Sequence, residues 1–134
     1  VPDSYAGGDG ADHLYAGSGA DTLDGGAGND SIYGNGGTDS LSGGDGDDNL
    51  SAYGSADAAW LDGGAGRDVM YGGNVADTMS GGADADTLYG NEGAGSLDGG
   101  TGNDQLFGAG ADDTLDGGAG ENLLMGGAGN DLYT

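Results

Sequence analysis

The feature that most constrains this chain is a nine-residue period that runs through almost its whole length. A clear copy is GGAGNDSIY at residues 25–33, and the same form returns at residues 43–51, 63–71, 99–107 and 126–134. In this register the chain reads as about fourteen consecutive copies over residues 7–134, with residues 1–6 as a lead-in outside the pattern. So short a period predicts a solenoid of stacked coils rather than a conventional globular domain.

Two positions of the repeat, the sixth and the eighth, carry the same type of residue in nearly every copy. The eighth is Leu in most copies and Ile32, Met70, Met79 or Tyr133 in the others. The sixth-position column reads Asp12, Asp21, Asp30, Asp39, Asp48, Asp57, Asp68, Asp77, Asp86, Gly95, Asp104, Asp113, Asn122 and Asp131. One copy is two residues longer, and with Asp57 in the sixth position the insertion is expected near residues 58–60.

This period with these residues resembles the RTX (repeats-in-toxin) family of secreted bacterial proteins, and the resemblance covers residues 7–134. It implies an all-β fold, a right-handed parallel β-roll. In that family the first six residues of each copy form a turn and the last three a short strand. Two copies then make one 18-residue coil, so about seven coils are expected here.

The composition shows that the chain needs help to fold. It contains 36 Gly and 24 acidic residues against one Arg and no Lys, with a formal charge of −23. Large apolar residues are too few for a conventional core, and by charge and hydrophobicity alone the chain would be disordered. The charge excludes nucleic acid as a partner, and no run of about 20 apolar residues could span a bilayer. Because there is no Cys, disulfides and thiolate zinc sites are excluded as well.

The turn residues have the chemistry of a calcium site. Glycine at positions one, two and four permits positive φ, so that carbonyl oxygens can converge. Calcium takes six to eight hard oxygen ligands, both carboxylate and carbonyl. The candidate carboxylate ligands are therefore the twelve Asp of the sixth-position column. The candidate carbonyl ligands lie in the turns at Gly8, Gly10, Gly26, Gly28, Gly44, Gly46, Gly64, Gly66, Gly100 and Gly102.

The resemblance further implies that each ion lies between one turn and the turn 18 residues on, bridging their two Asp side chains, with carbonyl oxygens near positions one to four completing the shell. Gly95 removes a carboxylate from two such sites and Asn122 weakens another, which leaves about nine complete sites. Nine divalent ions would reduce the charge from −23 to about −5. Val75 replaces a turn glycine and is β-branched, so we expect the turn at residues 72–77 to be distorted.

The ninth position differs between alternate copies. One set of copies carries Tyr15, Tyr33, Ser51, Tyr71, Tyr89, Phe107 and Met125 there, which predicts an aromatic ladder on one outer face. The ladder could simply stiffen the sheet by cross-strand stacking. It could also be a docking surface for a polysaccharide, a neighbouring domain or another copy of the chain.

Three single residues have local interpretations. His13, the only histidine, lies at a variable surface position and is not expected to be catalytic. Trp60 lies in the inserted copy, either as a local plug or as a binding residue, and Arg67 is expected to pair with a nearby carboxylate. The regular repetition of the aspartates indicates ligands rather than an active site, which is asymmetric and occurs once. No enzyme activity is expected.

These observations predict a calcium-binding module that folds outside a bacterial cell and stabilises, or assists the secretion of, a larger exported protein. The alternative is a polysaccharide- or surface-binding, adhesive module that uses the aromatic face.

Overall fold

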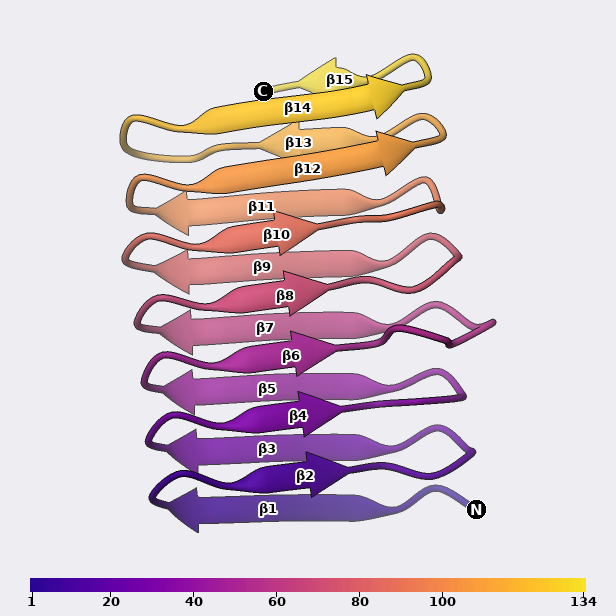
Figure 1. Cartoon of the computed structure of the whole chain (residues 1–134), viewed down its shortest axis with the longest axis vertical. Helices are drawn as coiled ribbons and strands as arrows, with labels where there is room; N and C mark the ends of the chain where they lie inside the picture. Colours follow the sequence, from indigo (N-terminus) through magenta and orange to yellow (C-terminus); the bar gives the residue numbers. More distant parts are fainter.

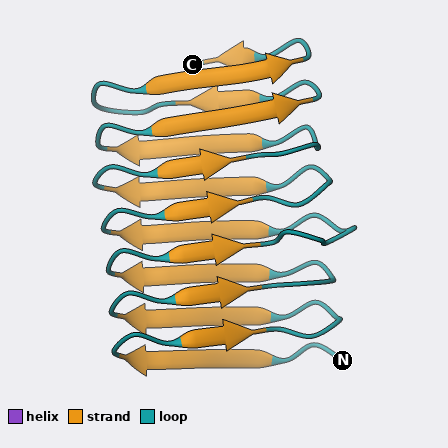
Figure 2. Ribbon diagram, in the orientation of Figure 1, coloured by secondary structure: helices purple, strands orange, loops and turns teal.

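The computed structural model describes residues 1–134 as an all-β solenoid. Its strands form two parallel sheets, one of 8 strands and one of 7, joined only by turns (Figure 2). The two termini lie at opposite ends of the stack (Figure 1). No helix in the structure is long and apolar enough to cross a membrane.

The odd-numbered strands form one sheet, called the odd sheet below. They are β1 (Ser4–Asp9), β3 (Thr22–Ala27), β5 (Ser40–Asp45), β7 (Trp60–Ala65), β9 (Thr78–Ala83), β11 (Ser96–Thr101), β13 (Thr114–Asp116) and β15 (Leu132–Tyr133). The even-numbered strands form the even sheet. They are β2 (His13–Tyr15), β4 (Ser31–Tyr33), β6 (Asn49–Ser51), β8 (Val69–Tyr71), β10 (Thr87–Tyr89), β12 (Gln105–Gly110) and β14 (Leu123–Ala128).

The chain crosses from one sheet to the other at every turn, so each strand pairs with the strand two further along the sequence. Leu23 of β3 pairs with Leu41 of β5, and Ile32 of β4 pairs with Leu50 of β6, which is the 18-residue step of the coil. The predicted parallel β-roll of about seven coils is therefore confirmed.

The core is a single ladder of eighth-position side chains between the two sheets. The residues that are at most 1% exposed there are Leu23, Ile32, Leu41, Leu50, Leu61, Met70, Met79, Leu88, Leu97, Leu106 and Leu115. At the ends of the roll Leu14 and Leu124 are only partly buried, and Tyr133 is exposed. A core one side chain thick leaves much of the stability to the turns.

The roll begins before the boundary predicted at residue 7. Ser4, Tyr5 and Ala6 pair in β1 with residues of β3, and Tyr5 packs partly buried against the core as an eighth-position residue would. The sequence missed this copy because it lacks the turn that would precede it.

The insertion lies earlier than predicted, and the sixth-position assignment of Asp57 is wrong. Ser40 pairs with Trp60, and the Trp60 N–H donates to the Asp39 carbonyl at 2.9 Å, so that Ala59 stacks on Asp39. Because Leu61 must stay inward, the register of β7 is fixed and the extra residues are absorbed in the turn. Asp57 is exposed there, on the loop that protrudes furthest in Figure 1.

Candidate metal-binding turns

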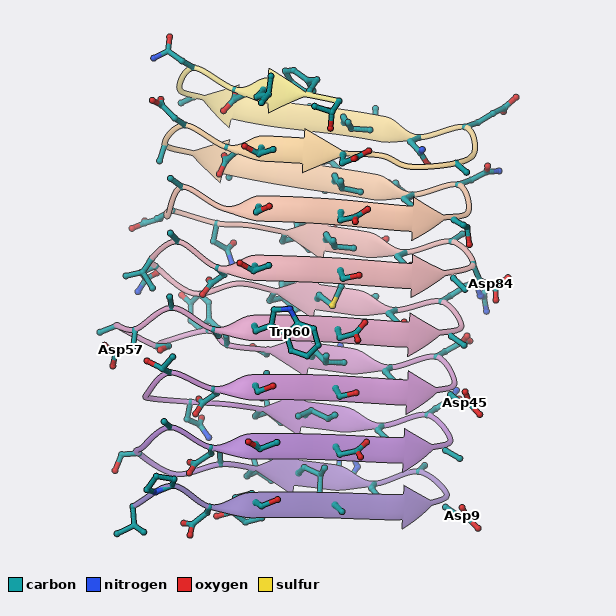
Figure 3. The ribbon with its side chains drawn as sticks, turned by 180° about the vertical axis from the view of Figure 1, so that it is seen from behind. Asp9, Asp45, Asp57, Trp60 and Asp84 are labelled. Carbon is teal, nitrogen blue, oxygen red and sulfur yellow. The ribbon has the colours of Figure 1, made fainter.

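The turns form two edges of different character. The regular edge, on the left of Figure 1, contains the turns that follow the odd strands, at residues 7–12, 25–30, 43–48, 63–68, 81–86, 99–104 and 117–122. The variable edge, on the right, contains the turns at residues 16–21, 34–39, 52–59, 72–77, 90–95, 108–113 and 126–131. Asp9, Asp45 and Asp84 project outward from the regular edge, and Asp57 from the variable edge (Figure 3).

Glycine is required on the regular edge for two different reasons. The ten predicted carbonyl glycines, at positions two and four, all have φ between +92° and +150°. Position one does not have positive φ, contrary to expectation. There the constraint is space, because a Cβ on Gly7 would lie 2.5 Å from the Gly25 carbonyl oxygen and 2.6 Å from Asp12 Oδ2.

One carboxylate oxygen of each regular-edge Asp holds neighbouring coils together. The Asp12 N–H donates to Asp30 Oδ1 at 2.7 Å, and the Asp30 N–H donates to Asp48 Oδ1 at 2.7 Å. The same bond recurs from Asp48 to Asp68, Asp68 to Asp86, Asp86 to Asp104 and Asp104 to Asn122, at 2.8 to 2.9 Å. The Asp column is thus a continuous ladder along this edge.

The other oxygen, Oδ2, has no hydrogen-bond partner at most of these positions. The eight buried Oδ2 atoms without one belong to Asp12, Asp30, Asp39, Asp48, Asp68, Asp86, Asp104 and Asp113. A buried oxygen without a partner costs about 1–3 kcal/mol, and more when it is charged. Six of them lie on the regular edge and two, Asp39 and Asp113, on the variable edge. So many orphaned oxygens indicate that the fold is built around a cation that the protein itself does not supply.

The orphaned oxygens face backbone carbonyls. A Cβ on Gly81 would lie 2.5 Å from Asp86 Oδ2 and 2.6 Å from the Gly99 oxygen, and Gly99 is surrounded in the same way by Asp104 Oδ2 and the Gly117 oxygen. Two hard oxygens therefore converge beside each position-one glycine. These position-one carbonyls lie within the range of carbonyl ligands that the family resemblance implies, although the ten glycines named above are all at positions two and four. Their signal in the sequence is a Gly at position one of every regular-edge turn, although the backbone there needs no positive φ.

The electrostatics agree with the geometry. Burial, together with the charges of neighbouring aspartates, raises the pKa of Asp48 and of Asp68 to about 6 and that of Asp86 to about 7. Backbone N–H donors act in the opposite direction, but they do not compensate. The only Arg pairs with exposed Asp47 at 3.1 Å, so it neutralises none of the buried carboxylates.

Two natural variations show what these turns require. Asn122 replaces Asp, and its Nδ2 donates to the Gly117 carbonyl at 2.6 Å. At Asp77 the Oδ2 atom accepts the N–H of Gly73. In both turns an electropositive N–H group lies where the other turns bring only oxygens together. The turns with orphaned Oδ2 atoms therefore fit a hard cation such as calcium, with carboxylate and carbonyl oxygens as its donors.

No three carboxylate or imidazole groups lie close enough together to hold a metal ion by themselves. Any ion at these turns must therefore take backbone carbonyl oxygens as well, which is the mixed oxygen set that calcium accepts. This requirement explains why the turn backbone is as strictly repeated as the aspartates.

The variable edge keeps only parts of the ladder. The Asp21 N–H donates to Asp39 Oδ1 at 2.9 Å, and the Asp113 N–H donates to Asp131 Oδ1 at 3.0 Å. Between these pairs the column is broken at Ala59 and at Gly95, neither of which has a carboxylate. The turn with Val75 contains no residue of positive φ and departs from the regular form, as expected.

Comparison with known protein families agrees with this geometry. The model of the RTX calcium-binding nonapeptide repeat matches residues 2–32, 15–50, 33–70, 43–79, 53–88, 62–106 and 98–133, which together span nearly the whole chain. A search of curated proteins found no match.

Proposed function

Because the chain belongs to the RTX calcium-binding nonapeptide repeat family, we propose that it is a folding switch, disordered without calcium and a β-roll with it. The observation that supports this proposal is the set of eight buried Oδ2 atoms that accept no hydrogen bond. Asp Oδ2 and the facing position-one carbonyl would hold each ion. One ion for each orphaned Oδ2 atom gives about eight, because the nine expected from the sequence included Asp57, which does not lie in the column.

Calcium supplies the positive charge that the turns lack, and the residues of the chain hold the oxygen ligands in place. In the folded roll the Oδ1 ladder fixes each carboxylate against the neighbouring coil, and this holds the Oδ2 atom in place for the ion. The thin core cannot offset 24 acidic residues against one Arg. The free energy of metal binding therefore contributes directly to the free energy of folding, as in other small domains that assemble around ions.

RTX repeat proteins are typically secreted by bacteria. We place this module outside the cell, where calcium modules work with dissociation constants of about 0.1–1 mM. There it would fold as calcium binds, and so stabilise, or assist the export of, the larger protein that carries it. Its role is structural rather than catalytic, since the repeated carboxylates form a uniform ladder and not one asymmetric cluster.

The alternative role, an adhesive surface, depends on the even sheet. The Tyr15 and Tyr33 rings stack with centroids 4.9 Å apart at 7°, and Tyr71 stacks on Tyr89 at 5.1 Å and 6°. Stacked rings turn their faces to one another rather than to a ligand, which favours stiffening of the sheet along most of the ladder.

Circular dichroism during a calcium titration tests the proposal. In EDTA the chain should show a coil spectrum, and β structure should appear cooperatively at about 0.1–1 mM calcium. Magnesium should not replace calcium, because it demands octahedral geometry and keeps its water. A stable β spectrum in EDTA would contradict the proposal.

A further inference from the structure

The outer face of the even sheet carries no charge. Its seventh and ninth positions are His13, Tyr15, Ser31, Tyr33, Asn49, Ser51, Val69, Tyr71, Thr87, Tyr89, Gln105, Phe107, Leu123 and Met125. None of the 24 acidic residues of the chain lies on these strands. The odd sheet differs, because Asp24, Asp62, Asp98 and Asp116 lie on its strands. The segregation of charge leaves one neutral, aromatic face, the front sheet in Figure 1.

The aromatic ladder on this face has one internal break. Tyr33 and Tyr71 both pair with Ser51, which lies between them on β6. Tyr33 stacks on Tyr15 on one side of the break, and on the other side Tyr71 stacks on Tyr89, which stacks on Phe107 at 5.1 Å. Each ring that borders the break therefore has one face covered by the ladder and one face directed toward Ser51.

The break has the dimensions of one ring. Two strand spacings separate Tyr33 from Tyr71, or about 9.6 Å. A ring midway between them would lie about 5 Å from each wall, a spacing at which rings stack favourably. Tyr53, which follows Ser51 by two residues, is 70% exposed and stacks on neither tyrosine.

The floor of the break is polar. Ser51 and Asn49 project from β6 on the same face, because residues two apart on a strand share a side. Ser51 Oγ accepts the Tyr53 N–H at 3.2 Å and keeps its own hydrogen free to donate. The Ser51 hydroxyl lies between the two rings, and the Asn49 amide lies beside it on β6, between Ser31 and Val69. A hydroxyl and an amide at the floor suit a ligand that is flat, uncharged and rich in hydroxyl groups.

We propose that the slot between Tyr33 and Tyr71, floored by Ser51 and Asn49, binds one pyranose ring of a neutral polysaccharide. The two tyrosine faces cover the apolar faces of the sugar, and the floor binds its hydroxyl groups. A second copy of the chain is a poorer occupant, since two molecules of charge −23 remain negative even when about eight calcium ions are bound to each.

Chemical-shift titration of the calcium-loaded chain with cellohexaose, maltohexaose and chitohexaose tests this site. At least one of these neutral glycans should bind, with a dissociation constant on the order of 1 mM. Ser51→Tyr completes the ladder and should abolish binding while the circular dichroism of the roll persists. Tyr71→Ala removes one wall and should weaken binding about tenfold. Phe107→Ala, the matched control, removes an aromatic of the same face away from the slot and should leave binding unchanged.

The outcomes that would overturn the proposal are distinct. If none of the three hexasaccharides shifts the signals of Tyr33 or Tyr71, the slot does not bind neutral glycans. If Ser51→Tyr binds as the parent chain does, the sugar binds elsewhere. If sedimentation shows self-association that Ser51→Tyr removes, the slot is an interface between copies instead.

Discussion

The two edges of the roll are built from the same nine-residue motif, yet only the regular edge repeats it without interruption. Its ladder runs from Asp12 to Asn122, whereas the variable edge is broken at Ala59 and Gly95. The variable edge has also absorbed an insertion that leaves the strands in register. The difference indicates that the core fixes the two strands of each coil, whereas a continuous side-chain ladder needs an oxygen acceptor at position six of every turn.

Turns outside the regular pattern indicate what can replace an ion. Asn122 supplies an N–H group to the Gly117 carbonyl, and Gly73 supplies one to Asp77 Oδ2. In both cases a neutral N–H donor lies where a cation is proposed to bind in the other turns. We therefore expect the need for calcium to depend on the position-six carboxylate rather than on the roll itself.

The largest expected effect follows from extending the Asn122 arrangement along the regular edge. In the sixfold Asp→Asn variant at residues 12, 30, 48, 68, 86 and 104, each Oδ1 acceptor is kept and each Oδ2 becomes a donor to a position-one carbonyl. We expect this chain to form the roll in EDTA, with a β spectrum that calcium hardly changes. Circular dichroism in EDTA measures the outcome.

A charge-matched control separates this effect from lowered repulsion. The exposed residues Asp9, Asp24, Asp45, Asp84, Asp98 and Asp116 can be changed to Asn instead. This control should still require calcium, although it carries the same net charge. Equal folding of both variants in EDTA would show that total charge, and not the turn geometry, prevents folding without calcium.

The second effect is acid folding of the calcium-free chain. The pKa of Asp86 is about 7 and those of Asp48 and Asp68 are about 6 in the roll, against about 3.9 in an unfolded chain. Their folded pKa values are raised, so ionisation destabilises the roll above about pH 7, and the penalty disappears as the pH falls toward about 4. We expect β structure in EDTA to increase between about pH 7 and 4.

In the presence of calcium we expect the opposite pH dependence, with less β structure at lower pH, because protons compete with the ion for the same oxygens. The calcium midpoint should therefore rise as the pH falls over the same range. Circular dichroism at a series of pH values, with and without calcium, checks both signs. A calcium-free chain that remains coil at pH 4 would contradict the burial of these carboxyl groups.

The repeat predicted most of this molecule. The nine-residue period determines the coil length, the inward column from Leu23 to Leu115, and the stacked aspartates, because each depends only on position within the period. Asp57 was misassigned because a pattern cannot locate an insertion inside a turn, where no inward residue fixes the register. The sequence could not predict either that Oδ1 accepts an N–H from the neighbouring coil while Oδ2 has no partner, since this depends on the distance between neighbouring coils.

The third effect compares two central aspartates on opposite edges. Asp68→Asn replaces an orphaned Oδ2, so one ion should be lost, at a cost of about 1.4 kcal/mol in 1 mM calcium for a site with a dissociation constant of about 0.1 mM. Both oxygens of Asp77 already accept N–H groups, from Ala59 and Gly73. Asp77→Asn should therefore reduce stability by about 1–3 kcal/mol without changing the number of ions bound.

Calorimetric stoichiometry at saturating calcium distinguishes the two cases, because only Asp68→Asn should bind about one ion fewer than the parent. If Asp77→Asn loses an ion and Asp68→Asn does not, the variable edge carries the sites and the assignment of the two edges is reversed.

The smallest effect concerns the backbone of the variable edge. Ala109 and Ala111 have φ of +78° and +73°, where the regular-edge turns place Gly at the same two positions except at Asp84. Holding an L-residue with a Cβ in this region costs about 1–2 kcal/mol, whereas Ala→Gly costs about 0.4–1 kcal/mol through the entropy of the unfolded chain. Because the backbone strain outweighs this loss of entropy, each Ala→Gly change should stabilise the roll by up to about 1 kcal/mol.

The reciprocal change on the regular edge should have the opposite sign. Gly100→Ala and Gly102→Ala would direct a Cβ against the carbonyl oxygens of Gly82 and Asp84 in the preceding coil, in addition to the positive φ. Urea denaturation at a fixed calcium concentration measures all four variants on one scale. If Ala109→Gly and Ala111→Gly destabilise the roll, the turn at residues 108–113 tolerates alanine without strain, and the two edges differ only in their carboxylates.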